Sequence, residues 1–309
     1  MILTVTLNPL LEKRIIGKKE IYKAGGKGIN VSRQLNFLGI NNLAYTFLGG
    51  KNGKTIRQIL NEEKINFKHI PAKTETRSAL ITFDNNKVKT VFDPNNDVDE
   101  TEVEEFKSKL EKMIYNSSII IFSGSIPSKQ CEDIIPFGIE LAHRHDKISI
   151  VDTYGEHLQD CINMSPTVIH NNVQEVESSL NIKLETEKDK LDYLDYLYSK
   201  GIKLSFLTDG KNSAYVSKFD FHYKIENPKV EEADATGSGD AFMAGIIYGL
   251  EKSLVFDDFV KSASALGAAN AAKLSTCDVT EEEMNRFSTN VKLFTLGKKM
   301  KIINDSPTV

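Results

Sequence analysis

Cysteine is scarce in this chain: only Cys131, Cys161 and Cys277 occur, far apart and odd in number. They form no Cys-x-x-Cys pair, so neither a disulfide framework nor a zinc site is indicated, and a reducing compartment fits best. Long apolar runs are missing as well, and the first residues, MILTVTLNP, lack the basic and apolar regions of a signal peptide. We therefore expect a soluble, cytoplasmic protein without a membrane partner.

An excess of positive charge is absent too. The 39 lysines and arginines are balanced by 43 aspartates and glutamates, which gives a net charge of −4. This balance argues against a nucleic-acid surface and against a basic face that attracts membranes. With 309 residues the chain can bury a full core as one large domain or two modest ones. The expected partner is a small molecule or another protein.

Short β-branched segments alternate with longer amphipathic ones along the chain. This alternation predicts a mostly parallel sheet covered by helices on both faces, with ligands at the carboxyl ends of the strands. The predicted strands are Ile2–Leu7, Ser118–Phe122, Ile148–Asp152, Thr167–Ile169 and Leu204–Leu207. The predicted helices are Gly28–Leu38, Thr55–Glu63, Glu100–Ile114, Glu132–Arg144 and Lys188–Ser199.

One segment departs from this pattern. SALITFDNNKVKTVFD, from Ser78 to Asp93, alternates apolar and polar residues around Asn85-Asn86, which predicts an antiparallel hairpin. A hairpin inserted in an α/β chain often belongs to a lid, and we place a second lid segment at Arg14–Lys23. The polar end of the chain, residues 297–309, is expected to be a loosely held tail.

GGKNGKT, from Gly49 to Thr55, looks like a phosphate-binding P-loop but fails on spacing. A P-loop has four residues between its first glycine and Gly-Lys-Thr, and the residue at the required position is Leu48. Because backbone N–H groups of that loop wrap the phosphate, a deficit of one residue changes the cradle itself. The segment is better interpreted as a glycine turn before a helix.

Two other glycine segments carry candidate chemistry. AGGKGIN, from Ala24 to Asn30, places three glycines and a lysine before a helix, where a ligand can approach the backbone, although a plain turn explains it equally well. DATGSGDAFMAG, from Asp234 to Gly245, places Asp240 behind glycines at a helix start. Asp240 can be a first-turn acid, or a base that takes a proton beside amides that stabilise a transferred phosphoryl group. Together the two segments favour phosphoryl transfer without a P-loop.

In this combination the chain resembles the ribokinase-type sugar kinases, the PfkB family. The first family signature runs from Gly25 as Gly-Gly-x-Gly-x-Asn-x-Ser, and the second is Asp-x-Thr-Gly-Ser-Gly-Asp from Asp234 to Asp240. Further segments in family order extend the match to about Lys273: TLNP at Thr6–Pro9, TRSA at Thr76–Ala79, SGSIP at Ser123–Pro127, DTYG at Asp152–Gly155 and Asn172-x-x-Glu175.

The resemblance implies a single ribokinase-like α/β domain over residues 1–309. Its expected architecture is a three-layer sandwich with a central, mostly parallel sheet and a small β-sheet lid, the lid segments lying at about residues 12–23 and 71–98. The segments TLNP, AGGKGIN and SGSIP most resemble the branch of 1-phosphofructokinase and tagatose-6-phosphate kinase. The resemblance therefore implies a kinase that uses ATP and Mg²⁺ to phosphorylate a ketohexose monophosphate. It also implies a homodimer formed through the lid hairpin.

The resemblance also implies roles for single residues. Asp240 is the catalytic base, and Gly237, Ser238 and Gly239 form the anion hole. Glu175 orders Mg²⁺ through water. The sugar site is formed by Glu12, Gly25, Gly26, Lys27, Asn30, Arg77 and Ser125, with Lys27 and Arg77 at the phosphate that the substrate already carries. ATP is bound by Asn172, Thr208, Gly210, Thr236 and Asn270, the last of these beside adenine.

Three positions depart from the family pattern. Glu12 replaces the usual aspartate that binds sugar hydroxyls, and a carboxylate displaced by one methylene changes a two-hydroxyl contact. His170-Asn171 precede Asn172 where the family has Lys-Pro, and Asn95-Asn96 replace a Gly-Pro after the hairpin. Two alternatives follow: a kinase of an unphosphorylated sugar or a nucleoside, or a catalytically silent paralogue that binds a sugar phosphate.

Overall fold

The computed structural model describes residues 1–84 and 87–298, and its largest element is a ten-stranded sheet. The sheet order is β14-β13-β12-β11-β10-β9-β8-β1-β4-β5, and the strands from β11 to β5 run parallel, while β12, β13 and β14 are antiparallel. The strands are β1 (Ile2–Thr6), β4 (Asn42–Gly49), β5 (Phe67–Ala72), β8 (Ile119–Ser123), β9 (Ile148–Asp152), β10 (Val168–Asn172), β11 (Leu204–Thr208), β12 (Ala214–Lys218), β13 (Phe221–Glu226) and β14 (Lys292–Lys298).

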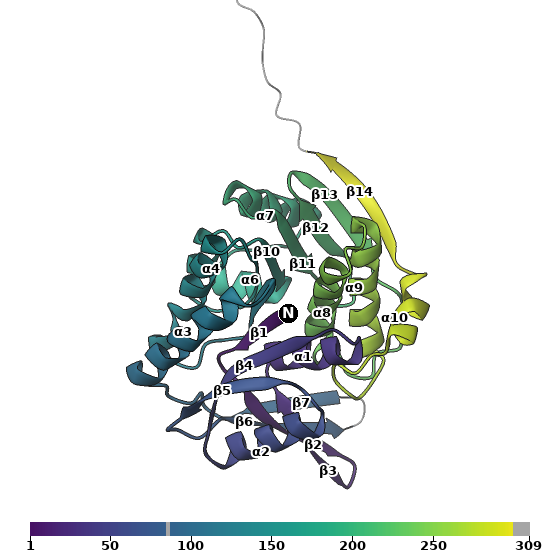
Figure 1. The fold of residues 1–309 in the computed structure, drawn as a ribbon. Coiled ribbons are helices and arrows are strands. Elements are labelled where there is room, and N and C mark those ends of the chain that lie inside the picture. The colour runs from purple at the N-terminus through teal and green to yellow at the C-terminus, as the bar shows by residue number, and fades with distance from the viewer. Residues whose placement is uncertain (85–86, 299–309) are drawn as a thin grey trace, which may run out of the picture.

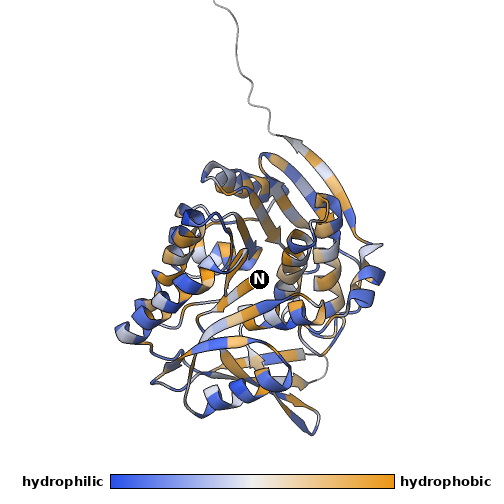
Figure 2. Ribbon diagram, in the orientation of Figure 1, coloured by the Kyte–Doolittle hydropathy of each residue, from blue (hydrophilic) through white to orange (hydrophobic). Residues whose placement is uncertain are grey.

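Helices cover both faces of this sheet (Figure 1). Side chains alternate across β1, so Leu3 and Val5 enter one core and Ile2 enters the other. The first core is closed by α3 (Glu100–Tyr115), α4 (Ile134–Arg144), α5 (Leu158–Asn163), α6 (Val173–Leu180) and α7 (Glu187–Ser199). The second is closed by α1 (Lys27–Phe37), α8 (Ser238–Glu251), α9 (Phe256–Ala271) and α10 (Glu281–Ser288). The central strands are mostly apolar, whereas the helices carry both apolar and polar residues (Figure 2). Two helical layers with a sheet between them confirm the predicted three-layer sandwich.

A second, four-stranded sheet lies beyond the β5 edge (Figure 1). Its order is β3-β2-β6-β7, with β2 and β6 parallel and the two outer pairs antiparallel. It is built from β2 (Leu10–Ile16), β3 (Lys19–Gly25), β6 (Ser78–Asp84) and β7 (Lys87–Phe92). Helix α2 (Gly50–Glu62) packs Ile56 and Leu60 against Leu11 and Ala24 of this sheet in a third apolar cluster.

The predicted elements agree with the structure to within a few residues at most ends. The predicted hairpin is confirmed as β6 and β7, and its turn, Asn85-Asn86, lies outside the described residues. Helix α2 begins at Gly50 rather than Thr55, and α4 begins at Ile134 after a short 3₁₀ turn at Lys129–Cys131. Strand β14 extends to Lys298, so the first two residues of the predicted tail are paired with β13, and residues 299–309 lie outside the described part. Within the described residues, no helix is both long and apolar enough to cross a bilayer.

Candidate active site

The start of α8 is an open helix end built by a glycine. Gly237 is the N-cap residue and has φ 79°, a left-handed conformation that favours glycine. A Cβ atom there would also lie 2.3 Å from Cγ2 of Thr276. The first amides of a helix have no partner within it, and of these the Ser238 N–H donates to the carbonyl of Ala235 at 3.1 Å. Gly237 and Gly239 thus offer the amides that an anion at this end can reach.

Asp240 lies in the first turn of α8 and is almost fully buried. Its side chain makes no capping bond; instead Oδ2 accepts a hydrogen bond from Nδ2 of Asn30 at 2.8 Å. Burial raises the pKa of Asp240 to about 7, although the nearby Lys27 ammonium opposes the shift. A carboxylate whose pKa lies near neutrality suits general base catalysis. Of the two interpretations of Asp240, this geometry favours the base.

Asn30 on α1 is held in one orientation by an arginine. Nη1 of Arg33 donates to Oδ1 of Asn30 at 2.7 Å, so the amide nitrogen of Asn30 is the group that faces Asp240. The Arg33 guanidinium itself is buried against Oε2 of Glu63 and the carbonyl of Ala24. Because Glu63 and Ala24 hold Arg33, and Arg33 in turn holds Asn30, the hydrogen bond from Asn30 to Asp240 is preorganised.

Lys27, the first residue of α1, lies between carboxylates. Its Nζ is 2.9 Å from Oδ1 of Asp152 and 2.6 Å from Oε1 of Glu175. Burial disfavours the charged form, but Asp152 and Glu175 outweigh this and hold the pKa of Lys27 above its ordinary value. The ammonium of Lys27 thus contacts two carboxylates beside Asp240. Its contact with the phosphate of the substrate, which the resemblance implies, stays a prediction.

Asp152 also contacts a buried histidine. Its Oδ1 lies 3.0 Å from Nδ1 of His170, whose Nε2 lies 3.2 Å from Oγ1 of Thr208. The imidazole stacks on Phe242 of α8, with ring centroids 5.5 Å apart. Charge from Lys27 and His170 lowers the pKa of Asp152 against the opposing effect of its burial. The carboxyl ends of β9, β10 and β11 are therefore joined through Asp152, His170 and Thr208.

Asn172 and Glu175 have a structural role that the sequence analysis did not weigh. Oδ1 of Asn172 accepts from the Glu175 N–H at 2.9 Å, and Oε2 of Glu175 accepts from the Asn172 N–H at 3.0 Å. The two residues form a capping box at the start of α6. Since Lys27 contacts the other oxygen of Glu175, the carboxylate has partners at both oxygens. The spacing Asn-x-x-Glu before an apolar helix was a sufficient signal for this cap.

A second polar cluster lies at the ends of β1 and β8. Nδ2 of Asn8 donates to Oδ1 of Asn95 and to Oγ of Ser125, both at 3.0 Å. Nη1 of Arg77 donates to the same Asn95 oxygen at 2.9 Å, and Nη2 lies 3.3 Å from the carbonyl of Asn8. Among the described residues, the buried Nε of Arg77 has no acceptor. Arg77 and Ser125 are thus brought together by Asn8 and Asn95, two residues that the sequence analysis did not propose for the site.

Of the residues predicted to bind ATP, Asn270 is buried in the protein and Gly210 lies in a surface loop. Asn270 is fully buried; its amide donates to the carbonyl of Thr236 and to Oγ of Ser238, and its oxygen accepts from the Cys277 N–H. Asn270 therefore supports the α8 turn, and its position beside adenine stays a prediction. Gly210 has φ 53° and open space around it, as a surface loop requires.

Gly25 and Gly26 are required by close approach. A Cβ on Gly25 would lie 2.6 Å from Oε1 of the buried Glu12, and a Cβ on Gly26 would lie 2.8 Å from Cγ2 of Thr6. The two glycines thus let β3 pass tightly over the end of β1. This places Glu12, Gly25 and Gly26 next to the start of α1, which carries Lys27 and Asn30.

In GGKNGKT, the segment that looks like a P-loop, a carboxylate of the protein occupies the helix N-terminus where a phosphate would bind. Helix α2 begins within GGKNGKT, and the N–H groups of Lys51 and Asn52 donate to the carboxylate of Glu75. A carboxylate at a helix N-terminus is stabilised by the same amides that would hold a phosphate. The rejection of this segment on spacing agrees with its structure.

A family model described as the pfkB family carbohydrate kinases matches residues 6–283 of the chain. The chain belongs to the pfkB family of carbohydrate kinases. It is similar to 1-phosphofructokinase of Borreliella burgdorferi, with 30% identity over 292 residues, 90% of this chain and 94% of that protein. It is also similar to tagatose-6-phosphate kinase of Staphylococcus epidermidis, with 27% identity over 309 residues, 95% of this chain and 99% of that protein.

Solved structures share the fold of this pfkB kinase. A protein of Thermotoga maritima described as a possible 1-phosphofructokinase superposes with a TM-score of 0.87 at 23% identity, over 96% of this chain and 99% of that chain. Phosphofructokinase-2 from Escherichia coli in complex with potassium gives 0.85 at 21% identity, over 93% and 98%. Both likenesses confirm the predicted ribokinase-like architecture.

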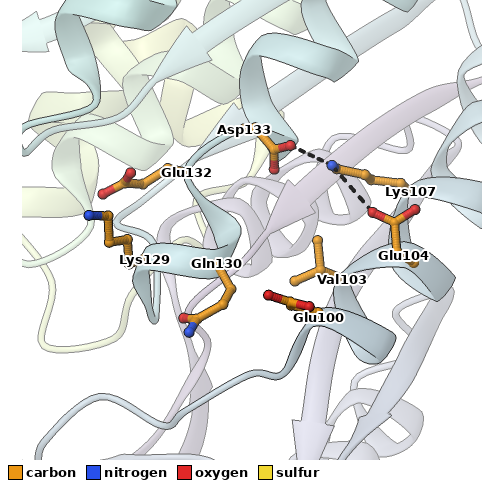
Figure 3. Close-up of a pocket in the computed structure, with 8 residues that line it drawn as sticks. All are labelled: Glu100, Val103, Glu104, Lys107, Lys129, Gln130, Glu132 and Asp133. Carbon is orange, nitrogen blue, oxygen red and sulfur yellow. Dashed lines mark hydrogen bonds and ion pairs between the residues drawn. The ribbon is translucent and has the colours of Figure 1, made fainter.

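Two surface hollows of the kinase lie apart from Asp240. One, of about 320 Å³, opens between α3 and residues 129–133, which precede α4, and there Lys107 reaches Asp133 and Glu104 (Figure 3). It contains none of the proposed site residues. Among the described residues, no group of three or more His, Cys, Asp or Glu side chains could hold a metal ion, there or elsewhere. The other, of about 560 Å³, lies beside the start of the second glycine segment and is lined by Lys229, Val230, Glu231, Glu232, Ala233, Ala272, Leu274 and Phe287.

Proposed function

We propose that this kinase transfers the γ-phosphoryl group of ATP to a hydroxyl of a ketohexose monophosphate, fructose 1-phosphate or tagatose 6-phosphate, and so forms a bisphosphate. The observation that carries the proposal is Asp240, buried at an open helix end with a pKa of about 7 and oriented by Asn30. The names of the two curated relatives supply the acceptor class.

In this mechanism Asp240 accepts the proton of the attacking hydroxyl. The amides of Gly237 and Gly239, at the positive end of α8, stabilise the charge that develops on the transferred group. The second polar cluster, with Arg77 and Ser125 around Asn8, binds the acceptor phosphate, since a guanidinium fork matches phosphate oxygens. Thr208, the last residue of β11, and Gly210, in the loop that follows, contact the nucleotide.

The residues present fit Mg²⁺ bound mainly through water and ATP phosphates. Mg²⁺ is often held by one or two carboxylates and keeps several waters, so a three-carboxylate cluster is not required. Glu175 is the carboxylate we propose for it, in competition with the Lys27 ammonium that lies 2.6 Å from its Oε1. When bound, Mg²⁺ neutralises charge on the phosphates.

A coupled ADP-release assay tests the proposal. Fructose 1-phosphate, fructose 6-phosphate and tagatose 6-phosphate are compared side by side with ribose and a nucleoside. We expect turnover with a ketohexose phosphate and little with the others. Phosphorylation of ribose or the nucleoside alone would show the alternative acceptor class, which the carboxylate partners of Lys27 favour. Binding of a sugar phosphate without turnover would show a silent paralogue.

We further propose that the small sheet is a lid and pairs with a second copy of the chain. Its outward face carries a cross-strand row of partly exposed residues, Tyr22, Lys13, Leu80 and Val91. Phosphofructokinase-2 from Escherichia coli, which shares the fold, has been described in a tetrameric inhibited form. A molar mass of one chain at micromolar concentration would contradict the dimer, and Leu80→Asp should convert a dimer to monomer.

A further inference from the structure

A charged side chain of the small sheet is buried against the segments that precede α8 and follow α9. Arg14 on β2 is only 1% exposed, which makes it one of the largest fully buried side chains of the protein. Arginine is almost never buried unless its donors are satisfied. Its neighbour on the same face of β2 is Glu12, and Nε of Arg14 lies 2.8 Å from Oε2 of Glu12.

The other end of the guanidinium reaches two segments more than 200 residues away. Nη1 donates to the carbonyl of Leu274 at 3.0 Å and lies 3.4 Å from Oδ2 of Asp234, and Nη2 donates to Oγ1 of Thr276 at 2.6 Å. Asp234 and Thr276 are also buried. A single side chain of β2 therefore joins the small sheet to the start of the second glycine segment and to residues 274–276, which follow α9.

Both contacted residues shape the turn that precedes α8. Oδ1 of Asp234 accepts from the Thr236 N–H at 2.9 Å, so one carboxylate holds Arg14 and the turn together. Cγ2 of Thr276 lies 2.3 Å from the position that a Cβ on Gly237 would take, and Sγ of Cys277 lies 3.4 Å from the Gly237 carbonyl. A displacement of the Arg14 partners would therefore be passed directly to the amides at Gly237 and Gly239.

The charges make this link hard to replace. Arg14 is a single cation between two buried carboxylates, Glu12 and Asp234. Loss of the guanidinium leaves both carboxylates in a dry environment without their cation, and the fork geometry that serves four acceptors at once is not available to lysine.

We propose that Arg14 is a positioning residue that couples the lid to the anion hole. When β2 is docked, Arg14 fixes Asp234 and Thr276, and these set the Gly237 turn in the geometry that receives the phosphoryl group. The ion pair between Arg14 and Glu12 also fixes Glu12 beside Gly25, in the proposed sugar site. Docking of the lid and assembly of the anion hole are thus one event. The inference rests on the proposed kinase function.

The test uses Arg14→Met, Arg14→Lys and Thr276→Val, with Lys18→Met as the control. Lys18 is exposed and lies in the turn between β2 and β3, outside the row of residues proposed for the dimer. Hydrogen exchange is measured on the full chain without ligand, and kcat and KM are measured with fructose 1-phosphate and tagatose 6-phosphate. Thr276→Val removes the hydroxyl that accepts from Arg14 but preserves shape and charge. It therefore tests the coupling even where Arg14→Met does not fold.

We expect Thr276→Val to raise exchange in residues 235–239 and also in β2, although β2 is distant in sequence. We expect kcat to fall by roughly 10²-fold in Arg14→Met with a smaller change in KM, partial recovery in Arg14→Lys, and no change in Lys18→Met. Because Arg14 and Thr276 act through one contact, the double variant should be no worse than Arg14→Met.

Exchange that rises at only one of the two segments, or losses of kcat that multiply in the double variant, would overturn the coupling. The exchange result does not depend on which acceptor is used. A wild-type enzyme without turnover would therefore refute the proposed function, while unchanged exchange would refute the role of Arg14.

Discussion

Replacement of Asp240 by asparagine should remove turnover and at the same time stabilise the folded protein at alkaline pH. Burial raises the pKa of Asp240 from 3.8 to about 7. The folded state therefore holds this proton more tightly than the unfolded chain does. The stabilising effect of the proton is complete below about pH 4, falls as pH rises toward 7, and is absent above that.

The size of the effect follows from the shift. About three pKa units at roughly 1.4 kcal/mol each give about 4 kcal/mol by which the ionised Asp240 destabilises the fold above pH 7. Asparagine has no proton to lose, so Asp240→Asn should recover most of this. For a chain of 309 residues the melting temperature should rise by about 6 °C at pH 8.

Thermal unfolding at pH 5 and pH 8 and a turnover assay check both parts. The melting difference between Asp240→Asn and wild type should grow from pH 5 to pH 8, and kcat should fall by roughly 10²-fold or more. Asp257→Asn is the control, because Asp257 is also a first-turn acid, on α9, but is exposed. Retained turnover would refute the base assignment, and a melting difference independent of pH would refute the energetic argument.

Three further outcomes are expected. Lys27→Met should move the midpoint of the pH–rate profile upward from about 7, because Lys27 is the cation that opposes the raised pKa of Asp240. Kinetics measured from pH 5 to 9 check this, and an unchanged or lower midpoint would contradict it. Gly237→Ala should lower both stability and kcat, since its Cβ would lie 2.3 Å from Thr276, whereas Gly239→Ala, with 3.6 Å of clearance to His170, should keep its melting temperature. Glu75→Gln should destabilise the chain by about 1 kcal/mol in denaturant titrations with kcat unchanged, and a kinetic defect would show that α2 takes part in the reaction.

The fold and the two glycine segments could be predicted because their signals are local. The alternation of strand and helix patterns fixed the three layers, and the order of the family segments identified the relatives. Local patterns also located Asp240 and Asn30, whose side chains the structure joins at 2.8 Å. GGKNGKT has one residue fewer than a P-loop between its first glycine and Gly-Lys-Thr, and this was enough to reject it as a P-loop.

The contacts that the sequence could not predict concern side chains whose partners lie far along the chain. Nothing near Lys27 in the sequence indicates that its ammonium meets Asp152 and Glu175, and nothing near Asn270 indicates that its amide supports the α8 turn. Arg14, with acceptors at residues 234, 274 and 276, was missed for the same reason.

The small sheet is assembled from two separate parts of the chain. Residues 10–25 supply β2 and β3, residues 78–92 supply β6 and β7, and the central pair β2–β6 is parallel. The backbone therefore passes four times between the two sheets, before β2, after β3, before β6 and after β7. Such a sheet cannot be gained, removed or exchanged as one contiguous cassette. Grafting it onto a related kinase would require two matched insertions, and a circular permutation that opens the chain between β3 and β6 would still leave both halves to meet across the same parallel pair.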